Sequence, residues 1–221
     1  MNVEVCNKIH RMKKLFSLIT ILSAVCFCRI NAQGNTDAQN ILDKTRTKIQ
    51  SSKGTNISFS LTQKDRQNTT VLTSKGTLLI KGPKYYLKQG NNEIFCNGEQ
   101  VWNYDGQSEV IVAKVETNDD EMSPQQIITG FNNKDFDIKL ISSAGTNYLL
   151  QLTPVDKRKN FTRVTLTVNK SSNLITKAAI TDKANAVTEI SFTNISLNVT
   201  TPDSRFVFDP SKHPGVEVVN Q

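Results

Sequence analysis

The chain has 221 residues, of which 37% are hydrophobic and 21% are charged, and its net charge is +7. It contains only two histidines and four cysteines, so a His-based catalytic pair or a multi-histidine metal site has little to draw on. The positive charge alone would suggest a nucleic-acid partner, but much of it lies in the first 32 residues.

Residues 1–32 have the layout of a secretory signal peptide. A positive segment from Met12 to Lys14 precedes an apolar run from Leu15 to Phe27. The small residue Ala32 then provides a candidate cleavage site. The apolar run is short for a membrane span. We therefore expect Met12 to be the true start and cleavage to follow Ala32. The alternatives are a retained membrane anchor and, with less support from the residues before its cysteines, a lipid anchor.

The remaining part, residues 33–221, is much closer to neutral. The signal carries five basic residues and one acidic residue, so 22 basic and 19 acidic side chains remain and the net charge falls to +3. The basicity is therefore no indication of nucleic-acid binding. Cys96 is the only cysteine left, which excludes an internal disulfide and predicts a small buried hydrophobe rather than a reactive thiol. The length fits a single domain with a substantial core.

One helix is predicted first. Thr36 is a candidate N-cap and Gly54 follows the expected end. Between them, mostly apolar residues recur at helical spacing and would lie on one face of the helix: Ala38, Ile41, Leu42, Thr45 and Ile49. The opposite side is polar and charged, so we expect this helix to lie on a surface.

Strands follow, separated by turns rich in glycine and asparagine. In the first half we expect strands near residues 57–61, 71–81, 85–87, 94–96, 101–104 and 110–115. In the second half we expect strands near residues 136–141, 148–153, 161–168, 174–181 and 187–197. A short helix starting at Ser123-Pro124 and closing at Gly130 is predicted between the halves. A turn about every ten residues indicates an antiparallel meander rather than βαβ units.

Several of these strands are apolar or aromatic on both faces. Examples are Leu78-Leu79-Ile80, Tyr85-Tyr86-Leu87 and Val110-Ile111-Val112. One apolar face is normal in an antiparallel sheet, whereas two need an explanation. From pattern alone, a two-sided core beneath the N-terminal helix is the simpler interpretation. The alternative is that one face lines a cavity.

Residues 33–221 contain no evident catalytic constellation. His213 is their only histidine, and no glycine-rich phosphate loop or Walker pattern occurs. Carboxylate pairs such as Asp135 with Asp137 fall in polar loops or at a strand start, where solvated charges are the simpler interpretation. We therefore expect no enzymatic activity, no cofactor and no metal.

Four segments resemble the motifs of one known protein family. Residues 76–83 (GTLLIKGP) resemble a G-x-L-x-[VI]-K-x-P strand, and residues 97–104 (NGEQVWNY) resemble a D-G-x-x-[LV]-W-x-Y hairpin. Residues 59–64 resemble an F-x-Q-x segment, and residues 206–218 resemble an F-x-F-x-P-P-x-G-V ending. Each motif alone is weak, but their order and spacing cover essentially all of residues 33–221. Together the four segments are similar to those of the outer-membrane lipoprotein carrier family, LolA.

The resemblance implies an α+β, mainly β fold: an incomplete, strongly curved antiparallel β-barrel. An N-terminal helix and a short lid-like helix would cover its apolar cavity. It further implies a monomeric periplasmic carrier that shields the acyl chains of lipoproteins between the inner and outer membranes. The implied partners are acylated lipoproteins, an inner-membrane lipoprotein exporter and an outer-membrane receptor. No nucleic acid is implied.

Site residues follow from the same resemblance. The expected apolar cavity residues are Phe59, Leu78, Ile80, Tyr86, Trp102 and Tyr104. The expected lid residues are Ile127, Ile128 and Phe131. For Trp102 and Tyr104, packing on the outer face of the sheet is an equal alternative.

One position departs from the family pattern. Well-known members have an arginine between the lysine and the proline of the strand motif, where it hydrogen-bonds the lid closed, whereas this chain has Gly82. This difference predicts a weaker or differently gated closure. The alternative function is a carrier of free lipid, or a lipid or lipoprotein sensor of the same fold that acts with a membrane partner.

Overall fold

A computed structural model describes residues 30–115, 127–128, 131 and 134–220. Its main element is a sheet of twelve strands in the order β12-β6-β5-β4-β3-β2-β1-β11-β10-β9-β8-β7. The strands of the first half are β1 Thr55–Lys64, β2 Thr70–Lys81, β3 Lys84–Gln89, β4 Asn92–Cys96, β5 Gln100–Tyr104 and β6 Glu109–Lys114. Those of the second half are β7 Phe136–Ser142, β8 Asn147–Pro154, β9 Phe161–Asn169, β10 Leu174–Asp182, β11 Val187–Leu197 and β12 Glu217–Asn220.

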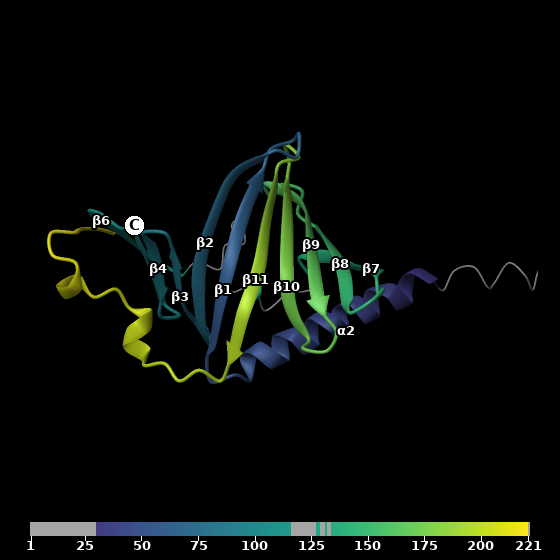
Figure 1. Cartoon of the computed structure of the whole chain (residues 1–221), viewed down its shortest axis with the longest axis horizontal. Coiled ribbons are helices and arrows are strands. Elements are labelled where there is room, and N and C mark those ends of the chain that lie inside the picture. The colour runs from purple at the N-terminus through teal and green to yellow at the C-terminus, as the bar shows by residue number, and fades with distance from the viewer. Residues whose placement is uncertain (1–29, 116–126, 129–130, 132–133, 221) are drawn as a thin grey trace, which may run out of the picture.

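The sheet is open and strongly curved, with both ends lying farther from the viewer than β1 and β11 (Figure 1). Consecutive strands up to β6, and again from β7 to β11, pair as antiparallel hairpins. β11 returns to pair with β1 and joins the two halves. The predicted incomplete antiparallel barrel and its strands are thereby confirmed.

The sequence did not predict β12, which pairs with β6 in parallel. Val218 lies opposite Val110, and the Glu217 amide donates to the Ser108 carbonyl at 2.8 Å. Four residues after a proline- and glycine-containing segment give little periodicity to detect. The pairing covers one side of β6, which would otherwise be a sheet edge.

Helix α2 spans Ile30–Gln50 and so begins earlier than predicted. Thr36 lies inside the helix rather than at its N-cap, although Gly54 does follow the helix end as expected. Gly34, two residues before Thr36, is a weak helix former that costs about 1 kcal/mol relative to alanine. The helix nevertheless continues through Gly34, so a possible capping residue near a glycine is not a sufficient signal for a helix start.

The concave face of the sheet forms the main core with α2. Ala38, Ile41, Leu42 and Ile49 are buried on the side of α2 that packs there, which confirms the predicted helix face. The strand side chains in this cluster come from both halves of the sheet, including Ile57, Leu78, Leu150, Leu166 and Ile190. The described part of the chain therefore has one shared apolar interior spanning the two halves.

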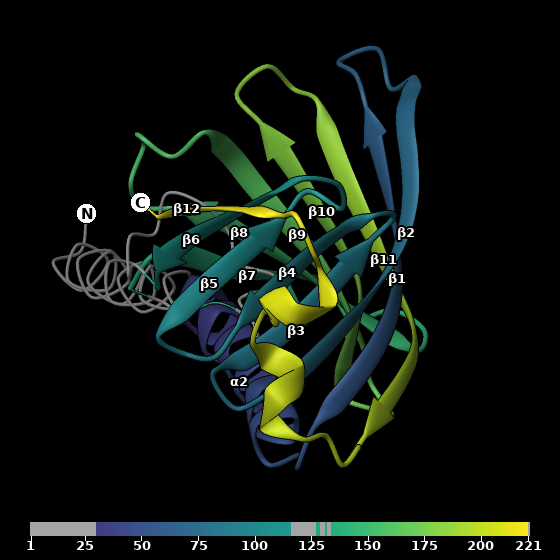
Figure 2. The same ribbon diagram turned by 90° about the vertical axis from the view of Figure 1, so that its left-hand side faces the viewer.

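The outer face of β2–β6 is covered by residues 199–220, here called the C-terminal strap. The strap contains the 3-10 turns Asp203–Phe206 and Pro210–Lys212 and ends in β12. Figure 2 shows it crossing the outside of β3, β4 and β5. Phe206 and Phe208 are buried against this face, and Phe95 meets Phe208 edge-on with ring centroids 5.8 Å apart.

Charged groups fasten the start of the strap. Asp203 accepts hydrogen bonds from Lys81 at 2.8 Å and Lys84 at 2.7 Å. These two lysines lower the pKa of the Asp203 carboxyl from 3.8 to about 2. The Arg205 guanidinium lies 4.2 Å from the centroid of the Tyr86 ring, a cation–π contact.

The strap contacts predict a pH dependence. Because the pKa of Asp203 is lower in the folded protein, its contribution is complete above about pH 4 and is lost as pH falls toward 2. Asp203→Asn should therefore lower Tm at pH 6, and the Tm difference from the wild type should shrink as pH approaches 2. A difference of equal size at both pH values would contradict this. Thermal melts of both proteins across the pH range provide the measurement.

A second prediction concerns Gly76, which faces the Phe59 ring across the strand pair. An alanine Cβ at residue 76 would lie 2.4 Å from both Phe59 Cζ and the Lys88 carbonyl oxygen. Gly76→Ala should therefore destabilise the protein by about 1–3 kcal/mol in urea unfolding. The exposed neighbour Thr77→Ala serves as the control. Equal free energies of unfolding for the two variants would show that the Phe59 ring can be accommodated without a glycine at residue 76.

Candidate functional site

The two faces of β2–β6 separate into two apolar surfaces because the side chains alternate. Across the strands, Leu78 lies opposite Leu87, and Leu87 lies opposite Ile94. These side chains point to the concave face, where they join the core beneath α2. The intervening side chains, beginning with Leu79 and Tyr86, point to the strap. Both apolar faces noticed in the sequence are thus covered, each by a different segment.

The structure divides the six expected cavity residues between these faces. Phe59, Leu78 and Ile80 are buried on the concave face. Tyr86, Trp102 and Tyr104 lie on the outer face with Phe206 and Phe208. For Trp102 and Tyr104 this corresponds to outer-face packing, the alternative left open by the sequence. The six therefore do not share one surface, and we assign the concave face as the candidate site.

Tyr86, on the outer face, takes part in a hydrogen-bond network with neighbouring side chains of the sheet. Tyr86 Oη donates to Glu93 at 2.6 Å, and Lys88 donates to the same carboxylate at 2.7 Å. Burial, followed by the Glu93 interaction, raises the pKa of Tyr86 to about 12. Burial would raise the pKa of Glu93, but the hydrogen bonds from Lys88 and Tyr86 outweigh burial and lower it. This arrangement keeps Tyr86 protonated and links β3 to β4 on the outer face.

The expected lid residues lie against the concave face. Ile127, Ile128 and Phe131 are each at most 7% exposed and belong to the main core, and Ile127 and Ile128 are helical. The Phe131 ring packs on Phe136 with centroids 4.8 Å apart. The predicted start of this helix at Ser123-Pro124 and its end at Gly130 lie outside the described residues.

A hydrogen-bonded chain on α2 holds the Phe131 backbone in place. Arg46 Nη2 donates to the Phe131 carbonyl at 3.0 Å, and Arg46 Nη1 donates to Asp43 at 2.8 Å. Gln39 Nε2 donates to the same Asp43 oxygen at 3.0 Å. Sequence analysis did not single out Gln39, Asp43 or Arg46. Their spacing of three and four residues is compatible with hydrogen bonds between neighbouring side chains on a helix. The same spacing is equally typical of an exposed polar helix face, so it did not identify the chain of hydrogen bonds.

The described residues Ile127, Ile128 and Phe131 are here called the lid segment. Arg46 therefore provides a contact between α2 and the lid segment that does not involve Gly82. Gly82 lies in the two-residue turn between β2 and β3 with φ +56°, a conformation that favours glycine. An added Cβ there would meet no atom within 4 Å. Turn geometry thus gives a local reason for glycine at this position.

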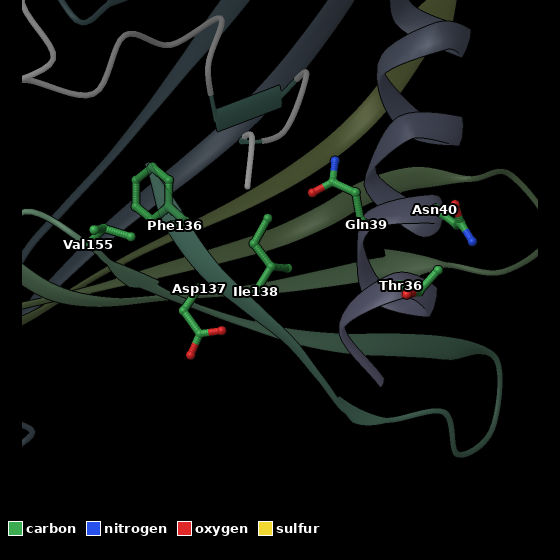
Figure 3. A pocket seen from close by; sticks show the side chains of 7 residues that line it. All are labelled: Thr36, Gln39, Asn40, Phe136, Asp137, Ile138 and Val155. Atoms are coloured by element: carbon green, nitrogen blue, oxygen red, sulfur yellow. The ribbon is translucent and has the colours of Figure 1, made fainter. Parts of the chain in front are cut away.

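Between α2 and β7 lies a pocket of about 480 Å³ (Figure 3). Gln39 and Asn40 contribute from the helix, and Phe136 and Ile138 contribute from the strand. Figure 3 shows the Gln39 side chain projecting from α2 toward Phe136 and Ile138. Because Phe136 and Ile138 also belong to the main core, the pocket borders the concave apolar interior.

Within the described residues, no group of three or more histidine, cysteine or acidic side chains is arranged to hold a metal ion. His213 stacks on the Phe208 ring with centroids 4.7 Å apart and so takes part in strap packing. Cys96 is free and buried, as expected. Burial raises the pKa of its thiol, which disfavours the reactive thiolate.

The fold and the candidate site together form an open, curved sheet whose apolar concave face is covered by one helix and a short segment. The family model described as "Outer membrane lipoprotein carrier protein LolA" matches residues 50–209. The chain therefore belongs to the LolA family.

Individual relatives agree with the family assignment. An outer-membrane lipoprotein carrier protein of Francisella philomiragia is 26% identical over 207 residues, covering 89% of this chain and 93% of the relative. One from Francisella tularensis subsp. novicida is 28% identical over 149 residues, covering 65% and 71%. Among solved structures, an uncharacterized conserved protein from Thermus thermophilus is similar in fold, with a TM-score of 0.56, 14% identity and coverage of 84% and 99%.

The part of the chain that the structure describes contains no helix long and apolar enough to cross a membrane. Residues 1–29, which hold most of the predicted signal peptide, lie outside that part.

The Arg46 contact generates a prediction about lid opening. Arg46→Met should remove the donor to the Phe131 carbonyl while retaining the aliphatic stem. Because the side chain is 29% exposed, we expect a modest effect: roughly threefold to tenfold faster entry and release of a fluorescent acyl probe. Lys44→Met, an exposed position on the same helix, is the control. Equal stopped-flow rates in both variants would exclude Arg46 as a closure contact.

Proposed function

We propose that this protein is a periplasmic carrier that shields the acyl chains of lipoproteins during transit from the inner to the outer membrane. The observation that carries the proposal is the apolar concave face, which continues across both halves of the sheet beneath α2. Membership of a lipoprotein carrier family supports the same conclusion.

The energetics suit reversible shielding. Each CH₂ removed from water contributes about 0.8 kcal/mol, so an acyl chain needs an extended apolar surface to cross an aqueous space. In the part of the chain that the structure describes, the polar contacts of the covering elements include Arg46 to the Phe131 carbonyl and Lys48 to the Ser172 carbonyl at 2.7 Å. Displacement of α2 or the lid segment would expose the concave face to an acyl chain. The displaced element would return to its place after the chain is released.

The proposed route requires export by the predicted signal peptide and exchange with membrane partners. An inner-membrane lipoprotein exporter would load the carrier, and an outer-membrane receptor would accept its cargo. In the proposed role, the protein acts as a monomer and performs no chemical reaction. Only five polar or charged side chains are buried among the described residues (Thr45, Thr55, Lys159, Thr181 and Thr201), and this scarcity supports the absence of a chemical step.

Native mass spectrometry of the protein isolated from its own periplasm tests the cargo. Co-purifying acylated polypeptides support the proposed transport. Phospholipid alone would contradict it and would favour the alternative of a free-lipid carrier or lipid sensor.

A pair of adjacent substitutions tests which face binds the acyl chain. Leu61 is half-buried on the concave face, whereas its neighbour Thr62 faces outward and pairs with Glu189. Leu61→Gln should weaken binding of a triacylated lipopeptide roughly tenfold, because an amide replaces apolar contact area. Thr62→Gln should leave binding unchanged. Calorimetric titration of both variants provides the measurement, and equal affinities would contradict the assignment of the concave face.

A further inference from the structure

The pocket between α2 and β7 contains one polar atom whose hydrogen bonding is incomplete. Gln39 Oε1 is buried, and no donor among the described residues lies within hydrogen-bonding distance of it. A buried acceptor without a donor is unfavourable, and such atoms are uncommon in folded proteins. This atom therefore indicates that the pocket accommodates a group that can donate to it.

The orientation of the Gln39 amide is fixed by its other end. Gln39 Nε2 donates to Asp43 Oδ1 at 3.0 Å, and a flipped amide would place its oxygen against that carboxylate. Asp43 is held in turn by Arg46 at 2.8 Å. Gln39 Oε1 is thus presented on the pocket side as an acceptor, and in Figure 3 it lies on the side of Phe136.

The surroundings restrict the charge of a ligand. Among the described residues, the side chains that line the pocket include the carboxylate of Asp137 but no lysine or arginine. Asp137 points away from Gln39 in Figure 3 and pairs with Lys139 at 3.1 Å. An anionic head group would therefore find an acceptor oxygen and no lining cation, whereas a neutral donor would satisfy Gln39.

The apolar side of the pocket restricts the rest of the ligand. Phe136 and Ile138 belong to the main core, and the Phe136 ring is flanked by Phe131 at 4.8 Å and Phe161 at 6.1 Å between centroids. A ligand that donates to Gln39 can place an attached apolar chain along these rings and into the concave interior.

We propose that this pocket binds the junction between an acyl chain and its head group, and that Gln39 Oε1 accepts a hydrogen bond from a neutral N–H or O–H group there. An amide-linked acyl chain, as in an N-acylated polypeptide, has this chemistry, and so does a monoacylglycerol. The inference rests on the proposed function, since it assigns the polar end of the same ligand. A free fatty acid, ionised at neutral pH, fits the site less well.

A matched pair of ligands tests the donor directly. N-methyldodecanamide carries one N–H group, and N,N-dimethyldodecanamide lacks it while keeping the same acyl chain and carbonyl. Displacement of a fluorescent acyl probe from the full chain gives the affinity of each. We expect the secondary amide to bind wild type roughly fivefold to tenfold more tightly.

The same ligand pair identifies the acceptor. In Gln39→Met, the side chain keeps similar length but has no amide, so the affinity ratio of the two ligands should fall to about one. Gln50→Met, at an exposed glutamine of the same helix, should retain the wild-type ratio.

Equal affinities for the two amides in wild type would overturn the proposal without need of any variant. A ratio that persists in Gln39→Met would also overturn it, since the donor would then be recognised elsewhere. Failure of both amides to bind would overturn the proposed function together with this inference.

Two natural ligand types are distinguished by a further comparison. A triacylated lipopeptide supplies an amide N–H, and monododecanoylglycerol supplies hydroxyl groups. A loss of affinity on Gln39→Met for the lipopeptide assigns the site to N-acylated polypeptides. A loss confined to the monoacylglycerol assigns it to free lipid, and no loss for either ligand would overturn the proposal.

Discussion

The packing of α2 on the concave face is the interaction on which the rest of the structure depends. A sheet that curves without closing leaves a broad apolar surface, which must be covered by another element. The four buried apolar side chains of α2 provide much of that cover, and the lid segment ending at Phe131 adds to it. Arg46 links these two covering elements through its hydrogen bond to the Phe131 carbonyl.

The outer face has a separate and more polar attachment. Asp203 with its two lysines and Arg205 over Tyr86 fasten the strap near the turn between β2 and β3, and buried aromatic rings continue the contact. Among the described residues, ion pairs of Asp203 and buried aromatic rings hold the strap on the outer face, whereas hydrogen bonds of Arg46 and Lys48 hold α2 on the concave side. Under the proposed function, ligand exchange would take place on the concave face while the strap keeps the outer face covered.

Sequence reasoning recovered the meander because each hairpin combines alternating side chains with a local turn such as Gly82-Pro83. It also found the apolar faces, but strand periodicity alone could not show that Leu78 and Tyr86 lie on opposite faces. That distinction depends on register between strands, which brings Leu78 opposite Leu87 and Tyr86 opposite Phe95. The parallel strand β12 and the Gln39–Asp43–Arg46 chain depend on contacts between distant segments, so local patterns did not reveal them.

Under the proposed function, the acyl chains of the cargo bind to the concave face, and contacts between labelled acyl methylenes and methyl groups of the protein test this most directly. Nuclear Overhauser effects from a ¹³C-labelled lipopeptide should reach Leu78, Leu87 and Ile94, which share the concave face. Contacts confined to Leu79 and Val110, on the face beneath the strap, would contradict the account.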